Sequence, residues 1–99
     1  MNFTKITIGE GVHAYDYWIA GIYKIVSYRK GKYHAYFIQE WCKNWGDCVC
    51  KPPSRDKTGG PCWLTFKAAK QDCEKHAQSY QPSAAIATRA REIKQSLMA

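Results

Sequence analysis

The chain has 99 residues, the length of one ordinary domain with room for a single modest core. Fifteen Lys and Arg residues against eight Asp and Glu residues give a net charge of +7, which favours anionic partners. Residues 1–11 contain no apolar signal-peptide core, and no stretch is apolar for long enough to cross a bilayer. We therefore expect a cytoplasmic protein without a membrane partner.

The first half of the chain is predicted to form antiparallel strands, because it contains alternating patterns and runs of β-branched and aromatic residues. Gly21 lies in the middle of the longest run, where it indicates a bulge within one long strand. Gly31 suits the positive φ of a tight turn, so the strands that flank it are expected to form a hairpin. The predicted strands are residues 3–8, 17–28 and 33–41.

The second half is predicted to form two helices after a short last strand at 61–64. Thr65 is a good N-cap, and apolar or small residues follow it at helical spacing over 66–80. Pro82 ends that helix and Ser83 caps the next one. The apolar faces are Phe66, Ala69, Cys73, Ala77 and Tyr80 in the first helix, and Ile86, Ala90, Ile93 and Leu97 in the second.

These elements predict an α+β fold, in which one amphipathic helix packs on a small antiparallel sheet of three to four strands and a C-terminal helix follows. We divide the chain into a sheet-plus-helix domain at 1–81, with a cysteine-rich loop at 42–61, and a C-terminal helix at 82–99. The apolar stripe of that last helix is expected to lie on the protein's own core. A homodimer through the same stripe is the alternative.

The cysteine-rich loop is the richest source of candidate chemistry, and three interpretations of it stay open. Its cysteines are candidate ligands of a structural zinc, although the spacing contains no CxxC knuckle, and Cys73 or His76 is a substitute ligand. A disulfide requires an oxidising environment. Small thiols packed beneath a long loop are the favoured interpretation, so we expect no cofactor other than this zinc. The four candidate ligands are Cys42, Cys48, Cys50 and Cys62.

We expect no enzymatic activity. His76 lies three residues after Cys73 on the predicted helix, but Cys73 belongs to the predicted core face, where a thiol is a poor nucleophile. The sequence contains no glycine loop that would cradle a phosphate, and no paired carboxylates for acid–base chemistry.

Basic residues interleaved with aromatic residues form the candidate binding surface. Such mixtures bind single strands by stacking and duplexes through phosphates, although a solvated turn with half-buried tyrosines explains the hairpin tip equally well. Four of these residues lie at the hairpin tip and five in the long loop. They are Arg29, Lys30, Lys32, Tyr33, Lys43, Trp45, Lys51, Arg55 and Lys57.

The segments GIYKI at 21–25, KYHAYFI at 32–38 and WLTFKAAKQDCEKHA at 63–77 resemble small phage and prophage accessory proteins. Their order is also similar to the sheet plus helix of AP2-type and integrase arm-binding domains. AP2-type domains read DNA with Arg and Trp on the exposed sheet face. This chain offers there no run of strand arginines, but five other residues: Lys24, Arg29, Lys30, Lys32 and His34.

The resemblance implies a phage accessory or anti-defence protein, for example an anti-CRISPR-like inhibitor that binds a host nucleoprotein complex in the host cell cytoplasm. The basic aromatic surface is expected to make that contact, because Tyr, Trp and Arg dominate interface hot spots. The alternative is a module of AP2-like shape that binds DNA or RNA directly.

Overall fold

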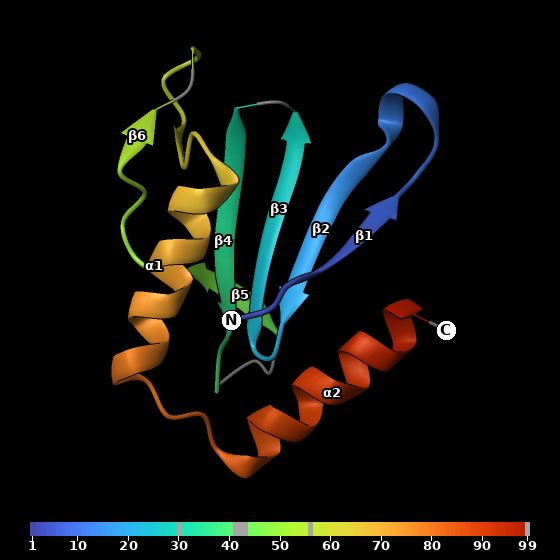
Figure 1. Ribbon diagram of the computed structural model, residues 1–99, viewed down its shortest axis with the longest axis vertical. Helices are drawn as coiled ribbons and strands as arrows, with labels where there is room; N and C mark the ends of the chain where they lie inside the picture. The colour runs from blue at the N-terminus through green and yellow to red at the C-terminus, as the bar shows by residue number, and fades with distance from the viewer. Residues whose placement is uncertain (30, 41–43, 56, 99) are drawn as a thin grey trace.

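The computed structural model describes residues 1–29, 31–40, 44–55 and 57–98. It confirms the α+β class: a five-stranded antiparallel sheet in the order β1-β2-β3-β4-β5, a two-stranded sheet and two helices (Figure 1). The large sheet contains β1 (Thr4–Ile8), β2 (Tyr15–Ala20), β3 (Tyr23–Arg29), β4 (Lys32–Ile38) and β5 (Trp45–Cys48). The other elements are the 3-10 helix η1 (Gly11–His13), β6 (Ser54–Arg55), β7 (Pro61–Cys62), α1 (Phe66–Ser79) and α2 (Ala84–Met98).

The prediction of one long strand at 17–28 is wrong, because the chain turns back between β2 and β3. Gly21 has a φ of 56°, in the left-handed region that a residue without Cβ enters at little cost. The turn pairs Ala20 with Tyr23 and Asp16 with Ser27 in an antiparallel hairpin. A glycine inside a β-branched and aromatic run therefore marks a turn here rather than a bulge.

The prediction of an irregular loop at 42–61 is also wrong for part of that segment. Residues Trp45–Cys48 form β5, which pairs with β4 through Tyr36 opposite Cys48 and Ile38 opposite Trp45. Further along, β6 and β7 form a small hairpin of their own. One part of the cysteine-rich segment, β5, is thus the edge strand of the large sheet.

Helix α1 covers one face of the sheet and packs against β3 and β4. The side-chain oxygen of Thr65 accepts a hydrogen bond of 3.1 Å from the backbone N–H of Ala68, which confirms the predicted cap. Phe66 begins the helix and contacts the ring of Trp18 at 4.9 Å between centroids. The centre of this layer is fully buried, with Ile25, Ala35, Ala69 and Cys73 each 0% exposed.

Trp63 links the cysteine-rich segment to both the sheet and α1. Its backbone N–H and C=O make two hydrogen bonds with Tyr33 of β4, at 2.9 and 2.8 Å. Its indole Nε1 donates to the Asp72 carboxylate of α1 at 2.7 Å, and the side chain is 0% exposed. Because a buried indole that has its partner is costly to displace, this residue fixes how the segment returns to the core.

Helix α2 crosses the end of the sheet where the β2–β3 turn lies (Figure 1). Ser83 caps it as predicted, accepting from the backbone N–H of Ile86 at 3.2 Å, and the Glu40 carboxylate accepts from both the N–H and the hydroxyl of Ser83. Ile86 and Ala90 are buried in the same core as the sheet and Ile93 packs against it, so this part of the stripe lies on the protein's own core. Neither described helix is long and apolar enough to cross a membrane.

Candidate functional site

The sheet face opposite α1 carries aromatic and basic side chains from four adjacent strands. Side chains alternate between the two faces of a strand, and the partners of α1 (Trp18, Tyr23 and Phe37) belong to one set. The other set we call the aromatic–lysine face, and its polar and aromatic members are half-buried. They are Tyr15, Tyr17, Lys24, Lys32, His34, Tyr36 and Trp45.

Lys24 lies at the centre of this face inside a cage of three aromatic rings. Its Nζ is 4.4 Å from the ring centroid of Trp45, 4.8 Å from that of Tyr17 and 5.4 Å from that of Tyr36. Burial lowers the pKa of the Lys24 ammonium from its ordinary value. The negative ring faces offset part of this desolvation, since a cation within about 6 Å of an aromatic centroid is attracted to it.

Register explains why these groups meet. Lys24 of β3 is directly opposite Tyr36 of β4. On the next strand, β5, Trp45 is opposite Ile38 of β4. Tyr17 comes from β2, where it is opposite Val26, two residues along β3 from Lys24. Cross-strand and diagonal neighbours on one sheet face lie within reach of aromatic and long side chains, so four strands supply one cluster.

The rings around the cage are themselves paired. Tyr15 and Tyr17 lie 5.3 Å apart between centroids on β2. His34 and Tyr36 lie 6.1 Å apart on β4, with ring planes only 15° from parallel. The face therefore presents two ring pairs on either side of one ammonium.

Lys24 and Lys32 are the cations among the described side chains of this face, and those side chains include no acid. The side chain of Asp47 in β5 lies outside what the structure describes. Helix α2 borders the face at a hollow of about 290 Å³ that Tyr17 and Trp45 line together with Ile93 and Leu97. Glu92 also lines this hollow, and Arg89 is 3.6 Å from its carboxylate.

Two aromatic residues of the predicted surface have positions that differ from the expectation. Trp45 was expected in an exposed polar loop, but it lies half-buried in β5 with its ring over Lys24, so that expectation is wrong. Tyr33 is directed to the opposite face, where its ring contacts Trp18 and Phe66 at 5.9 and 6.4 Å. Tyr33 therefore belongs to the core layer.

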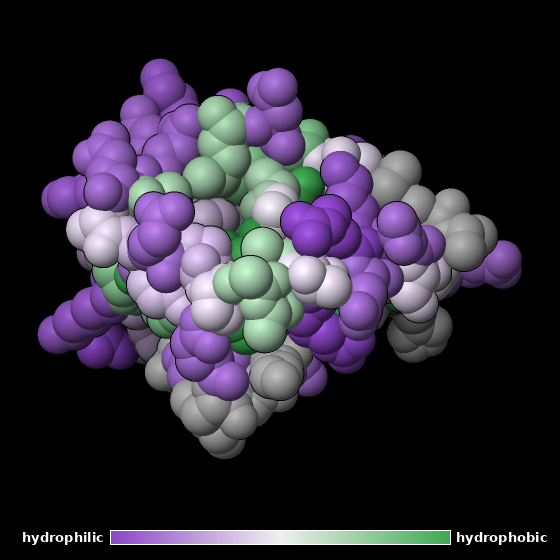
Figure 2. All heavy atoms as spheres, turned by 90° about the horizontal axis from the view of Figure 1, so that it is seen from below, coloured by the Kyte–Doolittle hydropathy of each residue, from purple (hydrophilic) through white to green (hydrophobic). Residues whose placement is uncertain are grey.

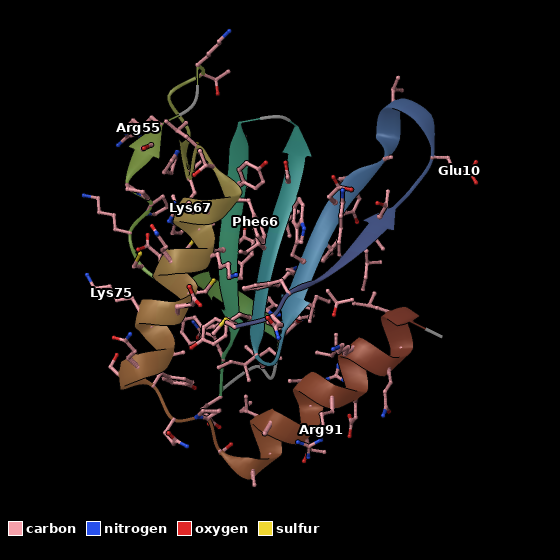
Figure 3. The ribbon with its side chains drawn as sticks, viewed as in Figure 1. Glu10, Arg55, Phe66, Lys67, Lys75 and Arg91 are labelled. Atoms are coloured by element: carbon pink, nitrogen blue, oxygen red, sulfur yellow. The ribbon has the colours of Figure 1, made fainter. Side chains whose placement is uncertain are left out.

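The basic loop residues lie apart from the aromatic–lysine face. Lys51, Arg55 and Lys57 are exposed, and the Arg55 guanidinium donates to the Gly59 carbonyl at 2.8 Å. In Figure 3, Arg55 lies on the same flank of the molecule as Lys67 and Lys75 of α1. Of the predicted hairpin-tip and loop residues, Lys30, Lys43 and the side chain of Arg29 lie outside what the structure describes. Among the predicted hairpin-tip and loop residues whose side chains the structure describes, Lys32 is the basic one that joins the aromatic–lysine face.

The sequence suggested Lys24 and His34 for the sheet face but gave no sign of the cage. Tyr17 and Tyr36 were missed as site residues. The signal that could have found them is the alternation itself: once Gly21 is assigned to a turn, Tyr17, Lys24 and Tyr36 all belong to one face.

The four described cysteines differ in burial. Cys62 and Cys73 are buried, Cys48 is half-buried and Cys50 is exposed. Within the described ranges, no group of three or more His, Cys, Asp or Glu side chains is placed to hold a metal ion. Cys42 lies outside the described residues, so the four-cysteine zinc site stays a prediction.

The thiols near α1 are suited to packing rather than to nucleophilic attack. Burial raises the pKa of Cys73 to about 12, with the Asp72 carboxylate adding to the effect. Desolvation and a hydrogen bond with Asp72 raise the pKa of Cys50. His76 contacts Phe37 at 4.4 Å between ring centroids, and its Nδ1 is hydrogen-bonded to the Tyr23 hydroxyl at 2.8 Å. The imidazole is thus engaged with the sheet.

Comparisons with known proteins add no family to this description. The sequence matches no protein-family model, and neither curated proteins nor solved structures give a significant match. The phage-type resemblance therefore rests on the sequence patterns alone.

Thiol reactivity tests the environments of the cysteines. We expect iodoacetamide to label Cys50 in the native protein, whereas Cys62 and Cys73, each 0% exposed, become labelled only after unfolding. Peptide mass spectrometry after timed labelling measures the order in which the cysteines react. Joint protection of Cys48, Cys50 and Cys62 that a chelator abolishes would instead establish the zinc site, and equal native labelling of all three would contradict the buried position of Cys62.

Proposed function

We propose that this is a non-enzymatic binding protein whose aromatic–lysine face contacts single-stranded RNA or DNA, free or within a nucleoprotein complex. The observation that carries the proposal is the cage of Tyr17, Tyr36 and Trp45 around Lys24, on a sheet face whose described side chains include no acid.

Exposed bases and phosphates match this arrangement. Every base has a π-face, so stacking on Tyr, Trp or His rings tolerates any sequence and contributes about 1–3 kcal/mol per base. Phosphates are attracted by Lys24 and Lys32. The rings hold the Lys24 ammonium in a fixed, partly desolvated place, where its attraction for an anion is stronger than in bulk water.

The size of the face also favours a single strand. Four adjacent strands, β2 to β5, are spaced about 4.8 Å apart and so present rings over about 14 Å. Small sheets that bind RNA in this way stack two or three bases. An AP2-like reading of duplex DNA is less well supported, since the strands of the five-stranded sheet contain one arginine, Arg29.

Oligonucleotide binding with two substitutions at one position tests the stacking. We expect Tyr36→Leu to weaken binding of an unstructured oligouridine or oligothymidine by about one order of magnitude or more, while Tyr36→Phe retains most of it. Fluorescence anisotropy at several salt concentrations measures the affinity. The affinity should fall as the salt concentration rises. The logarithm of the association constant should decrease against the logarithm of the salt concentration with a slope of about 0.7 per phosphate contact.

A matched control for this experiment lies on the opposite side of the molecule. Lys32→Gln removes one charge from the aromatic–lysine face, and Lys75→Gln removes one charge from the exposed flank of α1. The proposal requires Lys32→Gln to weaken binding and reduce the salt slope more than Lys75→Gln does. Equal effects of the two variants would show only general attraction to a basic protein.

The second candidate function is the anti-defence role that the sequence resemblance implies, an inhibitor of a host nucleoprotein complex such as a CRISPR effector. The observation that favours it is exposed apolar surface. Val12 of η1 is 94% exposed and Leu64, next to β7, is 50% exposed. The β1–β2 connection, the β3–β4 turn and the loop after β6 lie at the same end of the molecule (Figure 1). Exposed apolar surface rimmed by polar residues is typical of protein-binding surfaces.

Capture from nuclease-treated bacterial lysate tests the second candidate. We expect a nucleoprotein complex to be captured by the unchanged protein and lost with Leu64→Glu, because a carboxylate would enter the contact. Gln78→Glu places the same charge on an exposed site of α1 and should leave capture unchanged. The same captured proteins with both variants would count against this surface.

A further inference from the structure

A pocket of about 640 Å³ lies where α2 crosses the end of the sheet. The β2–β3 turn, the C-terminal end of α1 and one side of α2 form its walls, and the volume falls within the range of small-molecule sites. Seen from below, apolar side chains gather at the centre of this end of the molecule and hydrophilic ones surround them (Figure 2). The pocket is separate from the aromatic–lysine face, whose hollow beside α2 has different lining residues.

The pocket exists because the residues of α2 that face it are small. Ala87 and Ala90 line the pocket, where longer side chains would reach toward the β2–β3 turn. Gly21 and Ile22 of the turn, and Ala77 of α1, complete a wall without acidic groups. Tyr23 also lines the pocket, but its hydroxyl is already hydrogen-bonded to His76. The walls are therefore mainly apolar and suit a hydrocarbon or aromatic body.

The N-terminal ammonium of Met1, which also lines this pocket, is paired with the Glu74 carboxylate at 3.2 Å, whereas the two cations of α2 are not neutralised in this way. Arg91 and Lys94 line it from α2, and neither is in an ion pair among the residues that the structure describes. The Arg91 guanidinium only donates to the Thr88 hydroxyl at 3.2 Å. On another side of the same helix, Arg89 is 3.6 Å from the carboxylate of Glu92. Helix α2 thus pairs one cation with an acid and leaves two beside an apolar hollow.

We propose that this pocket binds a small amphipathic anion, an apolar molecule that ends in a carboxylate. The apolar body lies against the alanines of α2 and the β2–β3 turn, and the carboxylate accepts hydrogen bonds from Arg91 and Lys94. Arginine matches a carboxylate in a bidentate manner, and charge-assisted hydrogen bonds are stronger than neutral ones. Apolar surface removed from water supplies the rest of the affinity.

Decanoate, below its micelle concentration, is the probe for this site. We expect saturable binding by isothermal titration calorimetry, with amide shift changes at Gly21, Ile22 and along Ala84–Met98 in NMR spectra. Decylammonium has the same chain and the opposite charge, and it should bind at least about tenfold more weakly. Absence of saturable decanoate binding, or equal binding of the two probes, would overturn the proposal.

Variants separate the two parts of the site. The double variant Arg91→Gln and Lys94→Gln changes surface positions and should weaken decanoate binding about tenfold. Ala87→Leu fills the apolar part and should also reduce binding. Arg89→Gln removes the paired arginine of the same helix and should leave the affinity unchanged. An unchanged affinity in the double variant would contradict the assignment, whether or not Ala87→Leu folds.

Discussion

The arrangement of the molecule depends on Trp63, which is fully buried and bonded to two different layers. Two backbone hydrogen bonds hold it beside Tyr33 of β4, and its indole N–H holds it to Asp72 of α1. Since α1 begins three residues later, at Phe66, this anchor determines which face of the sheet the helix covers. The helix therefore covers one face, and the other carries the rings of Tyr17, Tyr36 and Trp45.

The aromatic rings on the two faces of the sheet pack against different groups. On the α1 side, aromatic rings pack on one another and on apolar residues, as in the contact of Phe66 with Trp18. On the other side, the rings pack on an ammonium, so a charged group stays partly buried without a carboxylate. Burying a cation in this way is costly unless the rings compensate. A face that keeps such a group is suited to anions, which is the reason for our functional proposal.

Several elements were predictable from the sequence because local signals were sufficient. Gly31 indicated the β3–β4 hairpin, Thr65 and Ser83 indicated the helix starts, and the spacing from Phe66 to Cys73 indicated the buried side of α1. Each of these depends on residues within about one turn of helix or one hairpin. The structure confirms all of them.

The strand pairing and the cage were not predictable in the same way. Gly21 fits both a bulge and a turn, and only the pairing partners of β2 distinguish the two. The assignment of Trp45 to a loop failed because β5 is short and follows a polar, cysteine-containing stretch. Lys24 meets Trp45 only through the register of three strands, which depends on contacts between residues distant in sequence. The candidate site is thus a product of tertiary pairing rather than of a motif.

The most direct test of the aromatic–lysine face is an NMR titration of the labelled protein with a short unstructured oligonucleotide. Our account predicts the largest shift changes at Tyr17, Lys24 and Tyr36, with those of α1 small. Changes concentrated on the exposed flank of α1, around Lys67 and Lys75, or no saturable change at low salt, would contradict it.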